Sequence, residues 1–99
     1  MKRTSVVIAL ALFGLTGSAF ANEANYGRNM ASACSSCHGT NGKSVGGMEA
    51  LNGYPKDKLV KAVQDFRSGA KPATVMHQLA KGYTDAQIEA IAAYYAAQK

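Results

Sequence analysis

Two cysteines and a histidine stand close together in the order Cys34-Ser35-Ser36-Cys37-His38. In a helix, residues three and four positions apart project from the same face, so both thiols and the imidazole point the same way. Thiols at this spacing can add to the two vinyl groups of one haem while the imidazole reaches its iron. The motif therefore predicts one covalent haem c, attached through Cys34 and Cys37, with His38 as the proximal axial ligand.

Three other uses of these residues compete with haem attachment. A disulfide between Cys34 and Cys37 suits an oxidising compartment, but it closes a very small loop and stabilises little. A redox-active thiol pair of the thioredoxin type needs strands alternating with helices, and no strand pattern is visible. A zinc site needs four ligands, and His77 would have to join Cys34, Cys37 and His38 to supply them.

The second axial position of the iron decides between electron transfer and ligand chemistry. Met30 precedes the motif by about one helical turn, which suits core packing, and Met48 lies in a glycine-rich segment. Met76 follows Pro72 in a segment able to cover the opposite haem face, and it is the preferred distal ligand. Its neighbour His77 would point about 100° away on a helix, so only one of the two can face the iron. A Met–His pair is typical of a closed, high-potential cytochrome site.

The N-terminus has the organisation of a secretory signal peptide. Lys2 and Arg3 precede an uncharged apolar stretch, which ends in the small-residue run Ala-Phe-Ala at positions 19–21. We expect residues 1–21 to be cleaved, which leaves a single domain of residues 22–99 in the periplasm. The uncharged run is barely long enough for a span and ends in small and aromatic residues, so no stable membrane anchor is expected.

Composition limits both the partners and the core. Without Lys2 and Arg3 the chain has nine basic and six acidic residues, and no basic tract is interleaved with aromatic residues. Nucleic acid is therefore not an expected partner. A domain of about 80 residues usually needs a cofactor, a metal or a disulfide for stability. Residues 22–99 contain no tryptophan and one phenylalanine, Phe66, so a bound apolar ring system would complete an otherwise small core.

The hydrophobic pattern predicts an all-α fold with no strand. Four helices are expected, over residues 24–37, 56–69, 73–81 and from Thr84 to about Tyr95. Leu59 and Phe66 lie on one apolar face of the second helix. Thr84 and Gln87 form a capping box that starts the last helix. Residues 39–55 contain five glycines and no periodicity, so they are expected to form a loop.

A wider set of residues carries a family resemblance: Gly27, the motif from Cys34 to His38, Gly39, Met76, Tyr83-Thr84-Asp85 and Ala92-Ala93-Tyr94-Tyr95. Together they resemble the bacterial class I cytochromes c, over essentially all of residues 22–99. The resemblance implies that the first and last helices cross nearly at right angles, with Gly27 at the crossing close to Tyr94 or Tyr95. It also implies one haem with an exposed edge and Met76 as its distal ligand.

Shorter stretches carry a narrower resemblance: residues 42–46, 65–69, 74–78 and 81–85. They are similar to the cytochrome subunit of flavocytochrome c sulfide dehydrogenase. The family has an Ile-Pro step in its loop, and the proline carbonyl accepts the hydrogen bond from the haem histidine. Met48-Glu49 stands at that place here, so the Glu49 carbonyl is expected to orient His38 without the rigidity of a proline.

These resemblances imply an electron-transfer protein and not an enzyme. A site closed by His38 and Met76 leaves no iron position for a substrate, so partners would exchange single electrons at the exposed haem edge. The expected role is the haem subunit that accepts electrons from a flavoprotein sulfide dehydrogenase. The alternatives are a free carrier between a periplasmic dehydrogenase and a terminal oxidase or reductase, and a haem sensor or peroxidase. The lysines that could steer an acidic partner are Lys56, Lys58, Lys61, Lys71 and Lys81.

Overall fold

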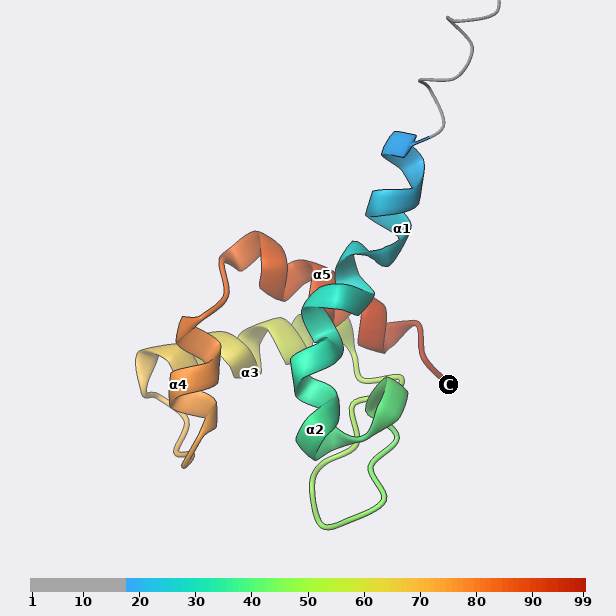
Figure 1. The fold of residues 1–99 in the computed structure, drawn as a ribbon. Helices are drawn as coiled ribbons and strands as arrows, with labels where there is room; N and C mark the ends of the chain where they lie inside the picture. The colour runs from blue at the N-terminus through green and yellow to red at the C-terminus, as the bar shows by residue number, and fades with distance from the viewer. Residues whose placement is uncertain (1–17) are drawn as a thin grey trace, which may run out of the picture.

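The computed structural model describes residues 18–99, and within that range the chain is helical with no strand (Figure 1). Its elements in chain order are α1 (Ser18–Ala31), η1 (Ser32–Cys34), α2 (Ser35–His38), η2 (Thr40–Gly42), α3 (Lys56–Ser68), α4 (Met76–Lys81) and α5 (Asp85–Ala96), where η marks a short 3-10 turn. The all-α prediction is confirmed. Most of the expected signal peptide lies outside the described residues. None of the helices in the described range combines the length and apolar character that a membrane span requires.

Helices α1 and α2 form one nearly continuous segment, joined by η1, and this segment carries the Cys-x-x-Cys-His motif. The helix predicted over residues 24–37 falls inside it, although α1 begins earlier, at Ser18. The Ser32 hydroxyl donates a hydrogen bond to the Asn29 carbonyl at 2.8 Å. Back-bonding of this kind bends helices, and the backbone tightens into the 3-10 turn at the same point. The segment ends at Gly39, whose φ of 87° leaves the helical region.

Helices α3 and α5 agree closely with the sequence pattern. Helix α3 ends directly before Gly69, which adopts the left-handed conformation. The predicted capping box at the start of α5 is confirmed. The Thr84 hydroxyl accepts from the Gln87 N–H at 3.2 Å, and the Gln87 side chain accepts from the Thr84 N–H at 2.9 Å. Asp85 follows in the first turn, where a negative charge is favourable.

Helix α4 is shorter than the sequence pattern predicts, and the expected start at residue 73 is wrong. The Val75 carbonyl is the first to accept a bond from within the helix, from the Leu79 N–H at 3.1 Å. Met76 is therefore the first residue of α4 and lies directly after the irregular segment of residues 69–75. This places the preferred distal ligand at a helix end instead of in a helix interior.

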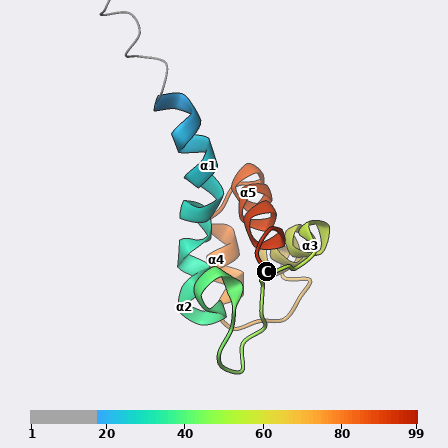
Figure 2. The ribbon, with the colours of Figure 1, turned by 90° about the vertical axis from the view of Figure 1, so that its right-hand side faces the viewer.

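Helices α1 and α5 pack against each other and cross, as the family resemblance implies (Figures 1 and 2). Gly27 lies at the contact, where an added Cβ atom would stand 2.7 Å from the Ala90 carbonyl oxygen and 3.4 Å from the Tyr94 Cβ atom. Only glycine allows so close an approach of the two backbones. The buried Tyr95 hydroxyl donates to the Ala31 carbonyl at 3.0 Å, so a hydrogen bond inside the core joins the same two helices.

The buried core of the described residues is small and centres on α5. Helix α3 packs against both α4 and α5. The cluster of buried side chains consists of Ala31, Leu59, Ile91, Ala92 and Tyr95. Two of these five are alanines, which bury little apolar area. The expectation of a small core is therefore confirmed.

The loop of residues 39–55 closes on Gly42. This buried residue has a φ of 76°, and its carbonyl accepts hydrogen bonds from the N–H groups of Leu51 at 2.9 Å and Asn52 at 3.3 Å. An added Cβ atom would lie 2.9 Å from the Tyr95 Cδ1 atom. The two ends of the loop are thus held together at a point that packs directly against the core.

Replacing Gly27 with alanine is expected to destabilise the protein, even though alanine favours a helix over glycine by about 1 kcal/mol. The added methyl group must displace backbone atoms of Ala90, so we expect a net loss of about 1–3 kcal/mol in the free energy of unfolding in urea. Gly46→Ala is the matched control, because a Cβ atom at Gly46 meets nothing within 4 Å. Equal losses in both variants would contradict a specific role for the crossing.

Candidate haem-binding site

A largely apolar cavity lies among the motif segment, the 39–55 loop and helices α3, α4 and α5. Helices α2 and α4 are separated from each other on the same side of α3 (Figures 1 and 2). Residues of both helices line the cavity, which therefore has walls from two distant parts of the chain. Its larger apolar side chains include Leu51, Leu59, Val63, Phe66, Ile88 and Ile91.

The motif lies on one wall of this cavity. Cys34, Cys37 and His38 all line it. Cys34 is half-buried and packs against the core cluster, whereas Cys37 is exposed and His38 is half-buried. Both thiols are free in the structure. The helical spacing of the motif thus directs the two sulfur atoms and the imidazole to a common space, as the sequence predicts.

The His38 imidazole is oriented by the loop. Its Nδ1 atom lies 2.6 Å from the carbonyl oxygen of Glu49. A carbonyl can only accept, so Nδ1 carries the proton and Nε2 keeps its lone pair for a metal. Ligating histidines usually have such a partner, which fixes the ring and raises its basicity. The prediction that the Glu49 carbonyl orients His38 is confirmed.

The burial of Cys34 does not favour a redox-active thiol pair. Burial raises the pKa of the Cys34 thiol, an effect only partly offset by a hydrogen bond with Tyr95. Redox-active Cys-x-x-Cys motifs work in the opposite direction, because they lower the thiol pKa to obtain a reactive thiolate. The strands of a thioredoxin-like fold are also absent from residues 18–99. The thioredoxin interpretation therefore has no structural support.

The alternative of a zinc site is not supported either. Within the described part of the chain, no group of three or more His, Cys, Asp or Glu side chains is arranged to hold a metal ion. His77 does not join the motif, because its Nε2 atom is 2.8 Å from the carbonyl oxygen of Lys71. The fourth ligand that this interpretation requires is therefore engaged elsewhere.

The structure reduces the candidates for the distal position to two. Met30 packs against the core cluster, as expected, and His77 is not among the residues that line the cavity. Met48 and Met76 both line it. Met48 directly precedes Glu49, whose carbonyl holds the Nδ1 side of His38. Met76 comes from α4, which lies apart from α2 (Figure 1), so it reaches the cavity from a different wall than His38.

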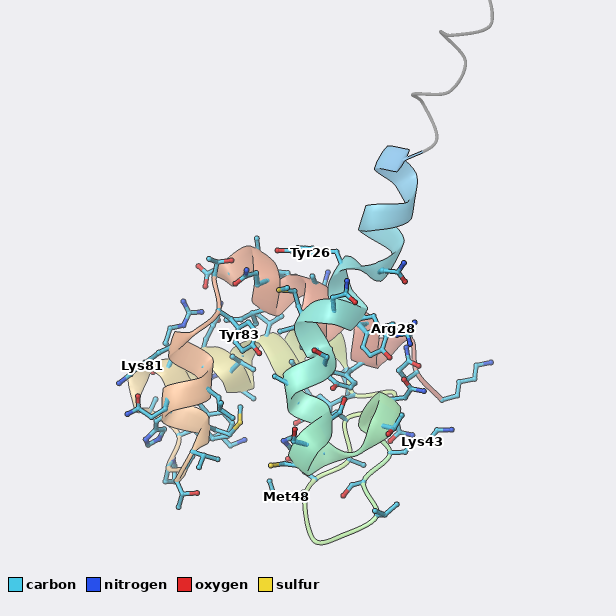
Figure 3. All side chains as sticks on the ribbon, viewed as in Figure 1. Tyr26, Arg28, Lys43, Met48, Lys81 and Tyr83 are labelled. Carbon is cyan, nitrogen blue, oxygen red and sulfur yellow. The ribbon has the colours of Figure 1, made fainter. Side chains whose placement is uncertain are left out.

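Two polar side chains reach the cavity without having been assigned there from the sequence. Lys71, expected among the surface lysines, lines it, and its ammonium lies 5.1 Å from the centre of the Phe66 ring. Tyr83 also lines it, and Figure 3 shows this side chain pointing from the α4–α5 connection toward the motif segment. Neither residue belongs to a periodic apolar pattern, although Tyr83 is among the residues that carry the family resemblance.

The arrangement suits a flat apolar ring with a metal at its centre. One wall offers two thiols for covalent attachment and an imidazole whose Nε2 atom is available for coordination. Another wall offers the thioether of Met76, and apolar side chains fill the space between them. Histidine and methionine are the axial ligand set of cytochromes c. The residues present therefore fit a covalently bound haem.

Comparison with known proteins gives the same result. Residues 24–98 match the cytochrome c family. The cytochrome subunit of sulfide dehydrogenase from Chlorobaculum tepidum is 36% identical over 69 residues, which cover 70% of this chain and 63% of that protein. Cytochrome c4 from Pseudomonas aeruginosa is 35% identical over 101 residues, covering 100% of this chain and 50% of that protein.

A third relative is named as an electron acceptor. The thiosulfate dehydrogenase electron acceptor of Thiomonas intermedia is 35% identical over 71 residues, covering 70% of this chain and 33% of that protein. The chain thus spans between one third and about two thirds of the length of these relatives. Because the family match extends over most of the chain and agrees with the motif and the cavity, the chain belongs to the cytochrome c family.

Proposed function

We propose that this cytochrome c carries single electrons in the periplasm and receives them from a flavoprotein sulfide dehydrogenase. Its family membership means that it holds a covalent haem c and transfers electrons without catalysing a reaction of its own. The observation that carries the site assignment is the His38–Glu49 hydrogen bond, formed beside a cavity that is also lined by both motif thiols and Met76.

Each proposed site residue has a separate task. Cys34 and Cys37 form the thioether bonds, His38 is the proximal axial ligand and Met76 is the distal one. Bound haem supplies the one-electron chemistry. The Glu49 carbonyl keeps the His38 ring in one orientation, the methionine thioether raises the reduction potential, and the apolar walls limit the access of water to the metal.

The proposed donor rests on similarity and on charge. The sulfide dehydrogenase subunit of Chlorobaculum tepidum is among the relatives, and electron-transfer partners meet through small, weak interfaces that are guided by charge. Of the five lysines considered, Lys56 pairs with Glu89 at 3.1 Å and Lys61 with Asp65 at 2.7 Å.

Two lysines are better suited to steering a partner. Lys58 and Lys81 are exposed and form no ion pair within the described residues, and Lys81 extends away from α4 in Figure 3. An acidic surface on the donor would complement them, since unpaired charges contribute most to long-range attraction.

A second role as a free carrier has its own support. The thiosulfate dehydrogenase electron acceptor and cytochrome c4 are also relatives of this chain. In this alternative the protein would move between a periplasmic dehydrogenase and a terminal oxidase or reductase. The distinction depends on whether a flavoprotein stays bound, because the haem site is the same in both cases.

The periplasmic location rests on the N-terminal sequence. Residues 1–21 have the charge pattern and the small-residue site of an export signal, and removing them leaves residues 22–99 as a single cytochrome domain. Export also suits the motif, because haem is attached covalently to Cys-x-x-Cys-His motifs in the compartment to which such a signal leads.

Met76→Ala is expected to abolish the far-red absorption band that ferric iron shows when it is bonded to methionine sulfur. The ferrous protein should then bind carbon monoxide, because no side chain closes the distal position, and the reduction potential should fall. Met48→Ala is the matched control, since Met48 is the same residue type and lines the same cavity. We expect the control to keep the band and exclude carbon monoxide; the reverse result would assign the distal position to Met48.

Replacing both Cys34 and Cys37 with alanine is expected to abolish covalent haem and cooperative folding. The buried cluster of the described residues is small, domains of this size are only marginally stable, and the apolar cavity walls would lose the ring that they pack against. Covalent haem is measured by the absorbance of the denatured protein, and folding by circular dichroism in urea. The double variant Ser35→Ala, Ser36→Ala should keep both properties, whereas cooperative unfolding of the cysteine variant would contradict the proposal.

The partner assignment is tested by purifying the native protein from periplasmic extract without a tag. We expect a flavin-containing protein to co-elute with it, and sulfide to reduce the haem only when that protein is present. The same preparation gives the mature N-terminus, expected at Asn22. A cytochrome that elutes without flavin, and that sulfide does not reduce in the presence of the remaining extract, would leave the free carrier as the function.

A further inference from the structure

The start of α4 has little to hold it in place by itself. Helix α4 has only six residues, and the side chain of Val75 forms no capping hydrogen bond. A helix this short is not stable in water without tertiary contacts. Ala80 anchors the second half of α4, since it is only 1% exposed. Val75, directly before the first residue of the helix, is 52% exposed and provides no such anchor. Other contacts must therefore fix the first turn, which contains Met76.

His77 makes such contacts. Its Nε2 atom lies 2.8 Å from the carbonyl oxygen of Lys71, so Nε2 carries the proton and donates it. The His77 ring also lies against the Phe66 ring, with 6.4 Å between the ring centres, and the Lys71 ammonium lies over the same Phe66 ring at 5.1 Å. Lys71, near the start of the irregular segment of residues 69–75, is thus joined to the first turn of α4, and both His77 and Lys71 contact Phe66 of α3.

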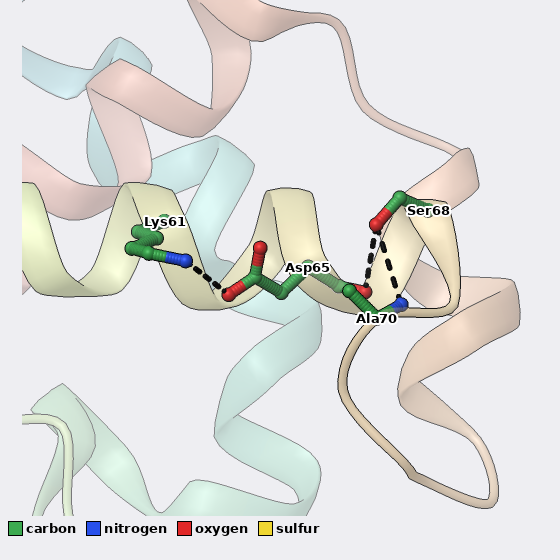
Figure 4. A network of polar contacts seen from close by, with 4 residues as sticks. All are labelled: Lys61, Asp65, Ser68 and Ala70. Atoms are coloured by element: carbon green, nitrogen blue, oxygen red, sulfur yellow. Dashed lines mark hydrogen bonds and ion pairs between the residues drawn. The ribbon is translucent and has the colours of Figure 1, made fainter.

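The acceptor of this hydrogen bond is itself fixed to α3. The Lys71 N–H donates to the Asp65 carbonyl at 3.1 Å. The Ser68 hydroxyl donates to the same carbonyl at 3.2 Å and accepts from the Ala70 N–H at 3.3 Å. The Asp65 carboxylate in turn pairs with Lys61 at 2.7 Å. Figure 4 shows these side-chain contacts, which continue the end of α3 into the segment that leads to Met76.

The geometry of the helix couples His77 to Met76. Adjacent helical residues point about 100° apart, so Met76 can line the cavity while His77 points to the Lys71 carbonyl. Any rotation or lifting of the first turn that removes Met76 from the cavity must also move His77. A withdrawal of Met76 by such a backbone movement would therefore break the hydrogen bond to Lys71 and separate the two rings.

We propose that His77 is a positioning residue, which holds Met76 at the iron through its hydrogen bond to the Lys71 carbonyl. This inference rests on the proposed assignment of Met76 as the distal ligand. His77 contributes no ligand of its own, and its effect is to lower the population of the open state in which Met76 has left the iron. That population controls how readily an external ligand binds.

The test measures the apparent affinity of the ferric protein for imidazole, because a ligand that needs the open state binds in proportion to its population. His77→Phe keeps an aromatic ring against Phe66 but removes the donor, and we expect the affinity to rise about fivefold, the factor that one net hydrogen bond represents. His77→Gln restores a donor and should return the affinity toward that of the original protein. Gln78→Ala, an exposed change on the same helix, is the matched control and should leave the affinity unchanged.

The urea midpoint and the far-red band distinguish the proposed positioning role of His77 from a purely structural role and from a wrong assignment of Met76. If His77→Phe lowers the urea midpoint while the imidazole affinity stays constant, His77 has a structural role only and the inference is wrong. If His77→Gln gives the same affinity as His77→Phe, the hydrogen bond is not responsible and the inference is also wrong. Failure of the ligand assignment itself looks different, because the far-red band would then survive Met76→Ala whatever residue occupies position 77.

Discussion

The hydrogen bond between His38 and the Glu49 carbonyl, 2.6 Å long, is the contact on which the geometry of the site depends. A carbonyl can hold an imidazole only if its own loop is fixed. This loop closes on Gly42, which packs against Tyr95, and Tyr95 donates to the Ala31 carbonyl inside the crossing of α1 and α5. The orientation of one ring is thus tied to the packing of the two terminal helices. In the absence of a rigid proline, these tertiary contacts hold the loop two residues beyond Glu49.

The sequence predicts well what local spacing determines. The motif directs its side chains to one face through helical periodicity alone, and Thr84 with Gln87 starts α5 through contacts between near neighbours. The start of α4 at Met76 and the bond from His77 to Lys71 were not predicted. Both depend on how an irregular segment folds back onto α3, and no residue pattern encodes that path. The sequence therefore identified Met76 as a candidate for the distal wall by its residue type, but it did not predict the geometry of that wall.

The two walls of the site differ in how they are held. The motif wall is a nearly continuous helical segment that packs against α5, and its His38 donates a hydrogen bond to the Glu49 carbonyl. The wall with Met76 is a six-residue helix that packs on α3 and buries Ala80, while its first turn, behind an exposed segment, is fixed by a hydrogen bond and ring contacts of His77. Regions with few buried contacts open at lower free energy than the rest of a structure. Met76 is thus the residue of the cavity whose position depends most on individual side-chain contacts.

This asymmetry also bears on how partners reach the protein. An electron carrier needs no substrate pocket, so the approach of a partner is governed by shape and by charge that the fold leaves uncompensated. The pairs Lys56–Glu89 and Lys61–Asp65 neutralise much of the positive charge of α3. Lys81 stays unpaired among the described residues and ends the same short helix that begins with Met76. A partner attracted to Lys81 would therefore approach the same short helix that carries Met76 at its other end.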